Sequence, residues 1–132
     1  MKSTVFRYIA AVLLALLLPQ LAYAADIVVI SHPGTSISAG DVKDIFLGEK
    51  QFAGGTKLLP VDNASLQDSF LSKFLDMPKS KYSSAWTKKS FRDGLSPPEM
   101  KSGDSEVIDF VKRNPGAVGY VSSAPSGVNV AR

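Results

Sequence analysis

Hydroxyl, amide and imidazole side chains gather at two places in the sequence, each directly after a run of residues typical of a buried strand. Backbone N–H groups and hydroxyls at the start of a helix suit an anion, because unpaired donors and the helix dipole converge there. The pattern therefore predicts oxyanion binding. The candidate ligands are His32, Thr35 and Ser36 in the first cluster and Asn63, Ser65 and Gln67 in the second.

Local structure offers a second explanation for both clusters. Ser and Thr hydroxyls satisfy the backbone in most turns, which would account for segment 32–36 without a ligand. Ser65 and Asp68 have the spacing of a helix capping box, which would account for the second cluster. Asp68 also adds negative charge where an anion would sit, and no Arg or Lys lies within that loop.

The sequence lacks the usual catalytic and metal-binding arrangements. It contains no cysteine and one histidine, His32, which excludes disulfides, Cys nucleophiles and His–His metal motifs. Neither a Gly-x-Ser-x-Gly elbow nor a phosphate-cradling P-loop is present. We therefore expect a binding protein that is not an enzyme and that uses no cofactor and no metal.

The N-terminus has the features of a secretory signal peptide. Lys2 and Arg7 precede an apolar run over 9–18, and Ala22 and Ala24 are small residues at the positions that a signal peptidase inspects. The run is shorter than the ~20 residues that span a bilayer comfortably. We expect residues 1–24 to be a signal peptide, followed by a periplasmic domain over 25–132 with no membrane insertion. The alternative is an uncleaved N-terminal anchor.

Charge argues against a nucleic-acid partner. The full sequence carries 15 Lys and Arg against 12 Asp and Glu, but Lys2 and Arg7 belong to the expected signal peptide. Without them 13 cations face 12 anions, a net charge of +1. Binding to nucleic acid or to an anionic membrane normally shows as a larger basic excess.

Strand-like and helix-like segments alternate along the mature chain, which predicts an α/β fold with a mainly parallel sheet. The expected strands are 26–31, 57–61 and 117–121, with 128–130 as a further candidate, and the expected helices begin near Ser38, Ser65, Pro78 and Asp104. Ligands bind such sheets at the carboxyl ends of the strands. We therefore expect the 32–36 loop to adjoin Asn63–Gln67, with the Tyr120 phenol at the side unless that ring only packs.

The helix expected after Pro78 carries several aromatic and basic residues. Tyr82, Trp86 and Phe91 lie at helical spacing, so we interpret them as core. The lysine pairs 79/81 and 88/89 are most simply solvated faces. Residues 92–102 are expected to be irregular.

Two segments are distinctive: Ile45–Lys50, Ile-Phe-Leu-Gly-Glu-Lys, and Asn114–Val121, Asn-Pro-Gly-Ala-Val-Gly-Tyr-Val. Their order, with the less specific segments between them, resembles the phosphate ABC-transporter substrate-binding proteins of the periplasmic-binding-protein-like superfamily, and more closely their short single-domain relatives. The less specific segments are Leu59–Asp62, Phe70–Met77, Trp86 to Phe91 and Pro97–Pro98.

The resemblance implies a single lobe of that α/β fold, a periplasmic location, and phosphate or a related oxyanion held without a cofactor. Its partner would be a membrane transporter. The family usually places Ser-Gly-Thr-Arg at the start of the helix after the second strand, where the Arg clamps phosphate. Here Ala64-Ser65-Leu66-Gln67 stands instead, so a bidentate, charge-assisted contact is lost.

This departure leaves a second function open, an accessory module that contacts another periplasmic protein through a degenerate ligand site. Surface near Phe52, Leu66 and Leu95 would separate the two functions. An exposed apolar patch there favours a protein partner, whereas a concave polar pocket favours a solute.

The first prediction concerns export. We expect the protein recovered from the periplasm to have the intact mass of residues 25–132, because a signal peptidase removes the first 24. A full-length species retained in the membrane would contradict the predicted location.

Overall fold

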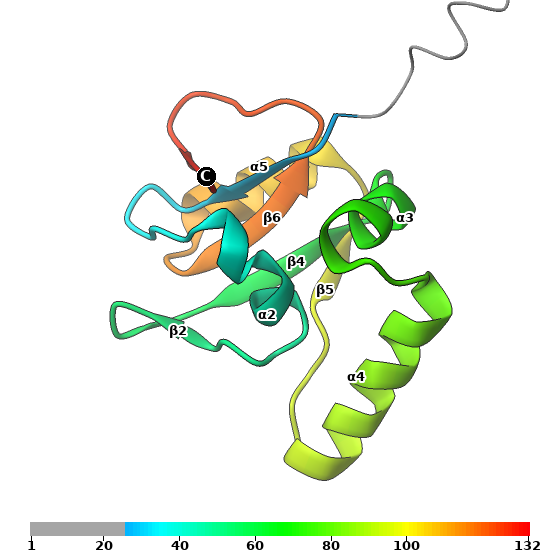
Figure 1. Cartoon of the computed structure of the whole chain (residues 1–132). Coiled ribbons are helices and arrows are strands. Elements are labelled where there is room, and N and C mark those ends of the chain that lie inside the picture. Colours follow the sequence, from blue (N-terminus) through cyan, green and yellow to red (C-terminus); the bar gives the residue numbers. More distant parts are fainter. Residues whose placement is uncertain (1–25) are drawn as a thin grey trace, which may run out of the picture.

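A five-stranded sheet organises the chain (Figure 1), with the strand order β5-β4-β6-β1-β7. The computed structural model describes residues 26–132, so the predicted signal peptide lies outside the described residues. A separate hairpin, β2–β3, turns at Gly54-Gly55. The strands are β1 (Val28–Ser31), β2 (Phe52–Ala53), β3 (Thr56–Lys57), β4 (Leu59–Asn63), β5 (Glu99–Lys101), β6 (Ala117–Val121) and β7 (Asn129–Val130).

The sheet is mainly parallel, as the alternation of strands and helices predicted. β4 pairs parallel with both β5 and β6. β1 pairs antiparallel with β6 and with β7, so it alone runs against the other four strands. The three expected strands are neighbours in the sheet, in the order β4-β6-β1, but the reversal of β1 was not anticipated.

All four expected helical segments are present. α3 and η2 are consecutive, and η2 has π-helical hydrogen bonding. The helices are η1 (Ala39–Asp41), α2 (Val42–Phe46), α3 (Gln67–Phe70), η2 (Leu71–Leu75), α4 (Lys79–Asp93) and α5 (Asp104–Arg113). Among residues 26–132, no helix is both long and apolar enough to cross a membrane.

Two strand boundaries differ from the sequence prediction. Residues 56–57 belong to the hairpin, so the expected strand 57–61 is in fact β4 at Leu59–Asn63. β5 lies inside the stretch expected to be irregular. Its three residues, Glu-Met-Lys, follow two prolines and show no apolar alternation, so the sequence gives little sign of a strand.

Helices cover both faces of the sheet, and each face has its own apolar core. Alternating residues of β6 supply both cores: Val118 and Tyr120 point to one face, Ala117 and Val121 to the other. The first face is covered by α2 and α3–η2, with Tyr82 and Trp86 of α4 joining its core, and the second face is covered by α5. This two-sided burial explains why β6 is buried at all five positions.

Helix α4 stands at one end of the molecule, away from the sheet (Figure 1), and one of its faces attaches it. Tyr82, Trp86 and Lys89 are its buried residues, spaced as neighbours on one helix face. The Trp86 indole N–H donates to the carbonyl of Phe46 at 3.0 Å. Lys89 forms an ion pair with Glu49.

Two expectations for α4 are wrong. Lys89 is buried rather than solvated, because it shares the inner face with Trp86 three residues before it. Phe91 is 89% exposed rather than part of the core. It follows Trp86 by five residues, which turns its side chain about 140° around the helix from the indole.

The second prediction tests how α5 packs on the sheet. A Cβ at Gly119 would lie 2.5 Å from Cγ1 of Val107, a stiff β-branched side chain, and 3.3 Å from Cγ2 of Val61. We expect Gly119→Ala to lower the free energy of unfolding by about 1–3 kcal/mol, as overpacking does. Urea denaturation measures the change. Gly40→Ala is the control, because the nearest atom to its added Cβ is 3.9 Å away, and an equal loss in both variants would contradict this packing.

Candidate functional site

The reversal of β1 separates the two predicted clusters. Ser31 pairs with Val118 near the start of β6, so the carboxyl end of β1 lies at the amino end of its neighbour. His32 N–H donates to the carbonyl of Ala117 at 3.0 Å, and Gly116 N–H donates to Thr35 Oγ1 at 2.9 Å. The prediction that the 32–36 loop adjoins Asn63–Gln67 is therefore wrong, since the two clusters lie at opposite ends of the strands.

Polar atoms of the 32–36 loop bind one another and the chain terminus. His32 Nδ1 accepts from Gly34 N–H at 3.0 Å, and Ser31 Oγ donates to the Thr35 carbonyl at 2.7 Å. Asn129 Nδ2 also donates to that carbonyl, at 3.0 Å. Thr35 is buried, whereas Ser36 is exposed. These contacts support the explanation of this loop as a polar turn.

The remaining predicted residues do come together, at the carboxyl ends of β4 and β6. Asn63 is fully buried at the end of β4, and its amide nitrogen donates to Asp104 Oδ1 at 2.7 Å and to the Tyr120 carbonyl at 3.0 Å. Its oxygen accepts from the Ser65 N–H at 3.0 Å and from the Ser65 hydroxyl at 2.6 Å. Asn63 thus ties together β4, β6, the start of α5 and the approach to α3.

Asp104 completes this network from the first turn of α5. Its second oxygen accepts from the N–H of Ser122, at 3.0 Å, and from the hydroxyl of the same residue. Partial burial alone would raise the pKa of the Asp104 carboxyl, but the hydrogen bonds from Ser122 and Asn63 outweigh it and hold that pKa below its usual range. Asp104 therefore stays ionised and adds negative charge to this edge.

The predicted capping box is wrong, and its failure leaves the start of α3 open. The Ser65 hydroxyl donates to Asn63 rather than serving the helix, and α3 begins two residues later with Leu66 as its N-cap. No side-chain hydrogen bond caps this helix start in the described chain. Leu66 N–H donates to Asn63 O and Phe70 N–H to Leu66 O, so the N–H groups of residues 67–69 lack intrahelical partners.

A buried carboxylate, Asp62, lies beside this helix. Asp62 Oδ2 accepts from the Tyr82 hydroxyl and Oδ1 from the Tyr120 hydroxyl, each at 2.8 Å. The Tyr120 ring stacks on Phe70 with centroids 3.8 Å apart, so its packing role is confirmed. Asp62 lies between Val61 and Asn63 in β4, and successive strand residues point to opposite faces of the sheet. Because both faces of this sheet are covered, the position of Asp62 in a strand was the signal for its burial.

Burial dominates the electrostatics of this cluster. It raises the pKa of the Asp62 carboxyl, although hydrogen bonds from Tyr120, Tyr82 and Gln67 act in the opposite direction. Burial and the nearby Asp62 charge also raise the pKa values of both tyrosines, so the phenols stay protonated. Both phenols keep their protons and donate them to Asp62, so neither hydroxyl is ionised as a nucleophile in this arrangement.

Gln67 lines a groove between α4 and β5. The side chain is buried, and its Oε1 has no hydrogen-bond partner within residues 26–132. The groove has a volume of about 450 Å³. It is lined in part by Asp62, Gln67, Tyr82, Trp86, Pro97 and Met100. Its buried polar atoms are acceptors, which suit a donor rather than an anion.

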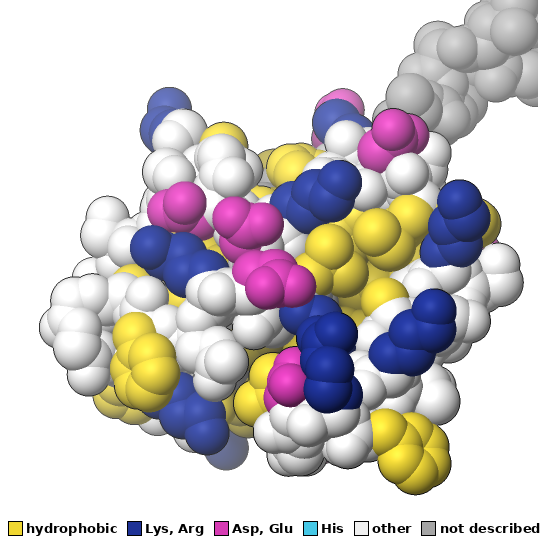
Figure 2. Space-filling model, turned by 60° about the horizontal axis from the view of Figure 1, so that its bottom comes forward, with side chains coloured by type: hydrophobic (Ala, Val, Ile, Leu, Met, Phe, Trp, Pro, Cys, Tyr) yellow, Lys and Arg dark blue, Asp and Glu magenta, His cyan; other side chains and the backbone are white. Residues whose placement is uncertain are grey.

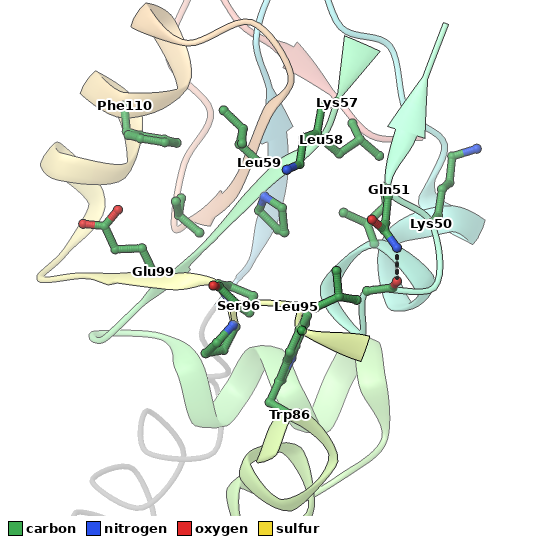
Figure 3. A pocket seen from close by; sticks show the side chains of 17 residues that line it. Lys50, Gln51, Lys57, Leu58, Leu59, Trp86, Leu95, Ser96, Glu99 and Phe110 are labelled. Atoms are coloured by element: carbon green, nitrogen blue, oxygen red, sulfur yellow. Dashed lines mark hydrogen bonds between the residues drawn. The ribbon is translucent and has the colours of Figure 1, made fainter. Parts of the chain in front are cut away.

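A second groove is mainly apolar (Figure 3). β5 pairs with β4 only from Val61 onward, so the first half of β4 has no strand beside it on that side. A groove of about 450 Å³ opens there, between the β2–β3 hairpin and residues 94–99. The Trp86 and Leu95 side chains point into it, with Lys57 and Glu99 at its rim. Phe52, on the hairpin, is 57% exposed.

The third prediction tests the buried carboxylate. Because the folded pKa of Asp62 is raised, this group favours the folded state most in acid, and that contribution is lost as the pH rises through the folded pKa. Tyr120→Phe removes a donor from the ionised form. We expect it to lower the free energy of unfolding by about 1–3 kcal/mol at neutral pH, and by less near about pH 4, where the carboxyl takes up a proton.

Chemical denaturation at several pH values measures this difference. Asp62→Asn provides the control background, in which Tyr120→Phe should cost the same at every pH. A loss independent of pH in the native background would contradict the role given to the Tyr120–Asp62 hydrogen bond.

Comparison with known proteins gives the fold a context. No protein-family model and no curated protein matches the chain. Solved structures do match. One is described as a phosphate ABC transporter substrate-binding protein from Clostridium perfringens with bound phosphate, at a TM-score of 0.60 and 17% identity, over 81% of this chain and 44% of that one.

Two further structures agree with it. PstS from Borrelia burgdorferi matches at a TM-score of 0.56 and 21% identity, over 80% of this chain and 46% of that one. An ABC-type phosphate transport receptor from Vibrio cholerae matches at a TM-score of 0.56 and 16% identity, over 81% of this chain and 45% of that one. The chain spans less than half the length of these proteins. Its fold, an α/β domain with a mainly parallel sheet, is similar to the matched part of these proteins, as the sequence resemblance implied.

Proposed function

We propose that the protein is a non-catalytic periplasmic binding module that holds phosphate or a related oxyanion at the start of α3. The observation that carries this proposal is the uncapped helix start, which follows the carboxyl end of a parallel strand. Anions bind at such positions, because free N–H groups and the helix dipole meet there. The solved structures with this fold are described as phosphate-binding or phosphate-transport proteins.

The donors for the anion would be backbone N–H groups of residues 67–69, with the Ser65 hydroxyl beside them. Asn63 supports the site from behind, because its own four hydrogen bonds are made within the protein. Neutral hydrogen bonds contribute ~0.5–1.5 kcal/mol each. Without a cation, we expect dissociation constants that are roughly high-micromolar or weaker.

Nearby carboxylates weaken the site further. Asp68 is exposed in the first turn of α3, and Asp104 is ionised close to the end of β4. The chain spans less than half the length of the matched proteins, and the start of α3 by itself leaves an anion partly in water. We therefore propose a low-affinity module that works beside a membrane transporter rather than a high-affinity receptor.

The fourth prediction tests the helix start by charge. Asp68→Asn removes the carboxylate nearest to the proposed anion, and we expect it to tighten phosphate binding roughly threefold, because exposed charges near a helix start act in this range. Isothermal titration calorimetry on residues 25–132 measures it. Asp76→Asn is the matched control, because Asp76 caps the far end of the same helical segment with φ of 53°, a conformation that Asn also adopts.

A larger change restores the missing cation. Gln67→Arg should tighten phosphate binding about tenfold or more, because an Arg–phosphate pair is bidentate and charge-assisted, although the Asp62 carboxylate beside position 67 competes for the guanidinium. Ser72→Arg adds the same charge on the exposed side of η2 and should leave the affinity unchanged. Equal effects of both arginines would indicate general attraction rather than a site at α3.

The alternative function is an accessory module that contacts another protein and binds no solute. The apolar groove of Figure 3, with exposed Phe52 beside it, favours this alternative. The same titrations separate the two functions. Absence of phosphate binding in the wild type and in Gln67→Arg would make the protein-interaction role the leading one.

A further inference from the structure

Helix α4 concentrates positive charge in a chain whose mature net charge is close to zero. Its sequence, Lys79–Asp93, contains five Lys and Arg residues and a single acid, Asp93. One of the five, Lys89, is buried against Glu49 and belongs to the attachment of the helix. The remaining four cations lie on exposed positions.

Three of these cations share one exposed side of α4. Lys81, Lys88 and Arg92 fall within about 40° of one another around the helix axis, and this stripe is turned about 120° from the midpoint of Tyr82 and Trp86. Phe91 borders the same face and is 89% exposed. Arg92 contacts Asp93 at 3.2 Å, but both side chains are exposed, so this pair competes weakly with other partners.

This outer face of α4 is exposed at Lys81, Lys88, Phe91 and Arg92. The helix stands at one end of the molecule (Figure 1), and the view that brings this end forward shows Lys and Arg side chains gathered there with hydrophobic side chains among them (Figure 2). None of the ion pairs among residues 26–132 involves Lys81 or Lys88. An exposed aromatic ring beside a row of cations is the combination found on helices that bind membrane surfaces.

We propose that the outer face of α4 binds the surface of a membrane that contains anionic lipids. A row of lysine and arginine side chains on a convex helix can meet a flat negative surface simultaneously, and each adds to the attraction. Phe91 would enter the interface between headgroups and acyl chains, as aromatic residues of surface-bound helices do. A lone protruding ring needs no preformed pocket in a lipid surface, whereas an acidic protein would have to supply one.

The inference does not depend on phosphate binding. It differs from the expectation from composition, which argued against an anionic membrane because the expected mature net charge is only +1. In the structure, four exposed cations lie together on α4, a helix that contains a single acidic residue. Contact through one helix face is also compatible with the absence of a spanning helix in the described chain.

Vesicle flotation with residues 25–132 tests the proposal, because both apolar cores lie within the described chain. We expect binding to vesicles of phosphatidylcholine mixed with phosphatidylglycerol, little binding to phosphatidylcholine alone, and loss of binding as salt is added. The triple variant Lys81→Gln/Lys88→Gln/Arg92→Gln should lower the partition coefficient by roughly tenfold or more. Phe91→Ser should lower it by roughly threefold, since one aromatic contact is lost.

The matched control removes the same charge elsewhere. Lys43→Gln/Lys57→Gln/Lys112→Gln changes three exposed lysines on other elements and should keep nearly full binding. Equal losses in the two triple variants would overturn the proposal, because net charge alone would then explain the attraction. Failure of the wild type to bind the mixed vesicles would also overturn it and would assign the outer face of α4 to an acidic protein.

Discussion

The Asn63 side chain uses all of its hydrogen-bonding capacity on the protein itself. The arrangement of the chain around the start of α3, where we propose an anion site, depends on these hydrogen bonds. It donates to Asp104 and to the backbone of β6, and it accepts twice from Ser65. A fully buried amide must find such partners, because an unsatisfied polar atom in the interior is costly. Ser65 is thereby taken from its expected capping role, and the N–H groups of α3 are left free.

The same edge is unusually rich in acceptors for a place that would hold an anion. Asp62, Asp104 and the Gln67 oxygen all lie near it, and the two tyrosines that could donate are already engaged by Asp62. Helix geometry therefore attracts negative charge while the side chains oppose it. This opposition is the physical reason for the weak affinity that we propose for an anion at the start of α3.

Local sequence patterns predicted the elements of this fold well and their mutual directions less well. α5 and β6 occur where amphipathic and β-branched periodicity placed them, because both depend on residues close in sequence. The direction of β1 depends on its pairing with residues almost ninety positions later, which no local pattern encodes. That single reversal moved His32, Thr35 and Ser36 away from the site. The exposure of Phe91 and the burial of Lys89 likewise depend on which face of α4 is attached.

The glycine of the Ile-Phe-Leu-Gly-Glu-Lys segment links the local and the distant parts of the structure. Gly48 has φ of 75°, and an added Cβ would lie 2.8 Å from the Trp86 ring. The positive φ and the nearby indole thus both require a residue without a Cβ at position 48. In evolutionary terms positions 48 and 86 form a linked pair: a lineage that replaced the glycine would first have to shrink the aromatic ring, and α4 would then lose its main anchor. The two residues should therefore be inherited together, even where the ligand site has diverged.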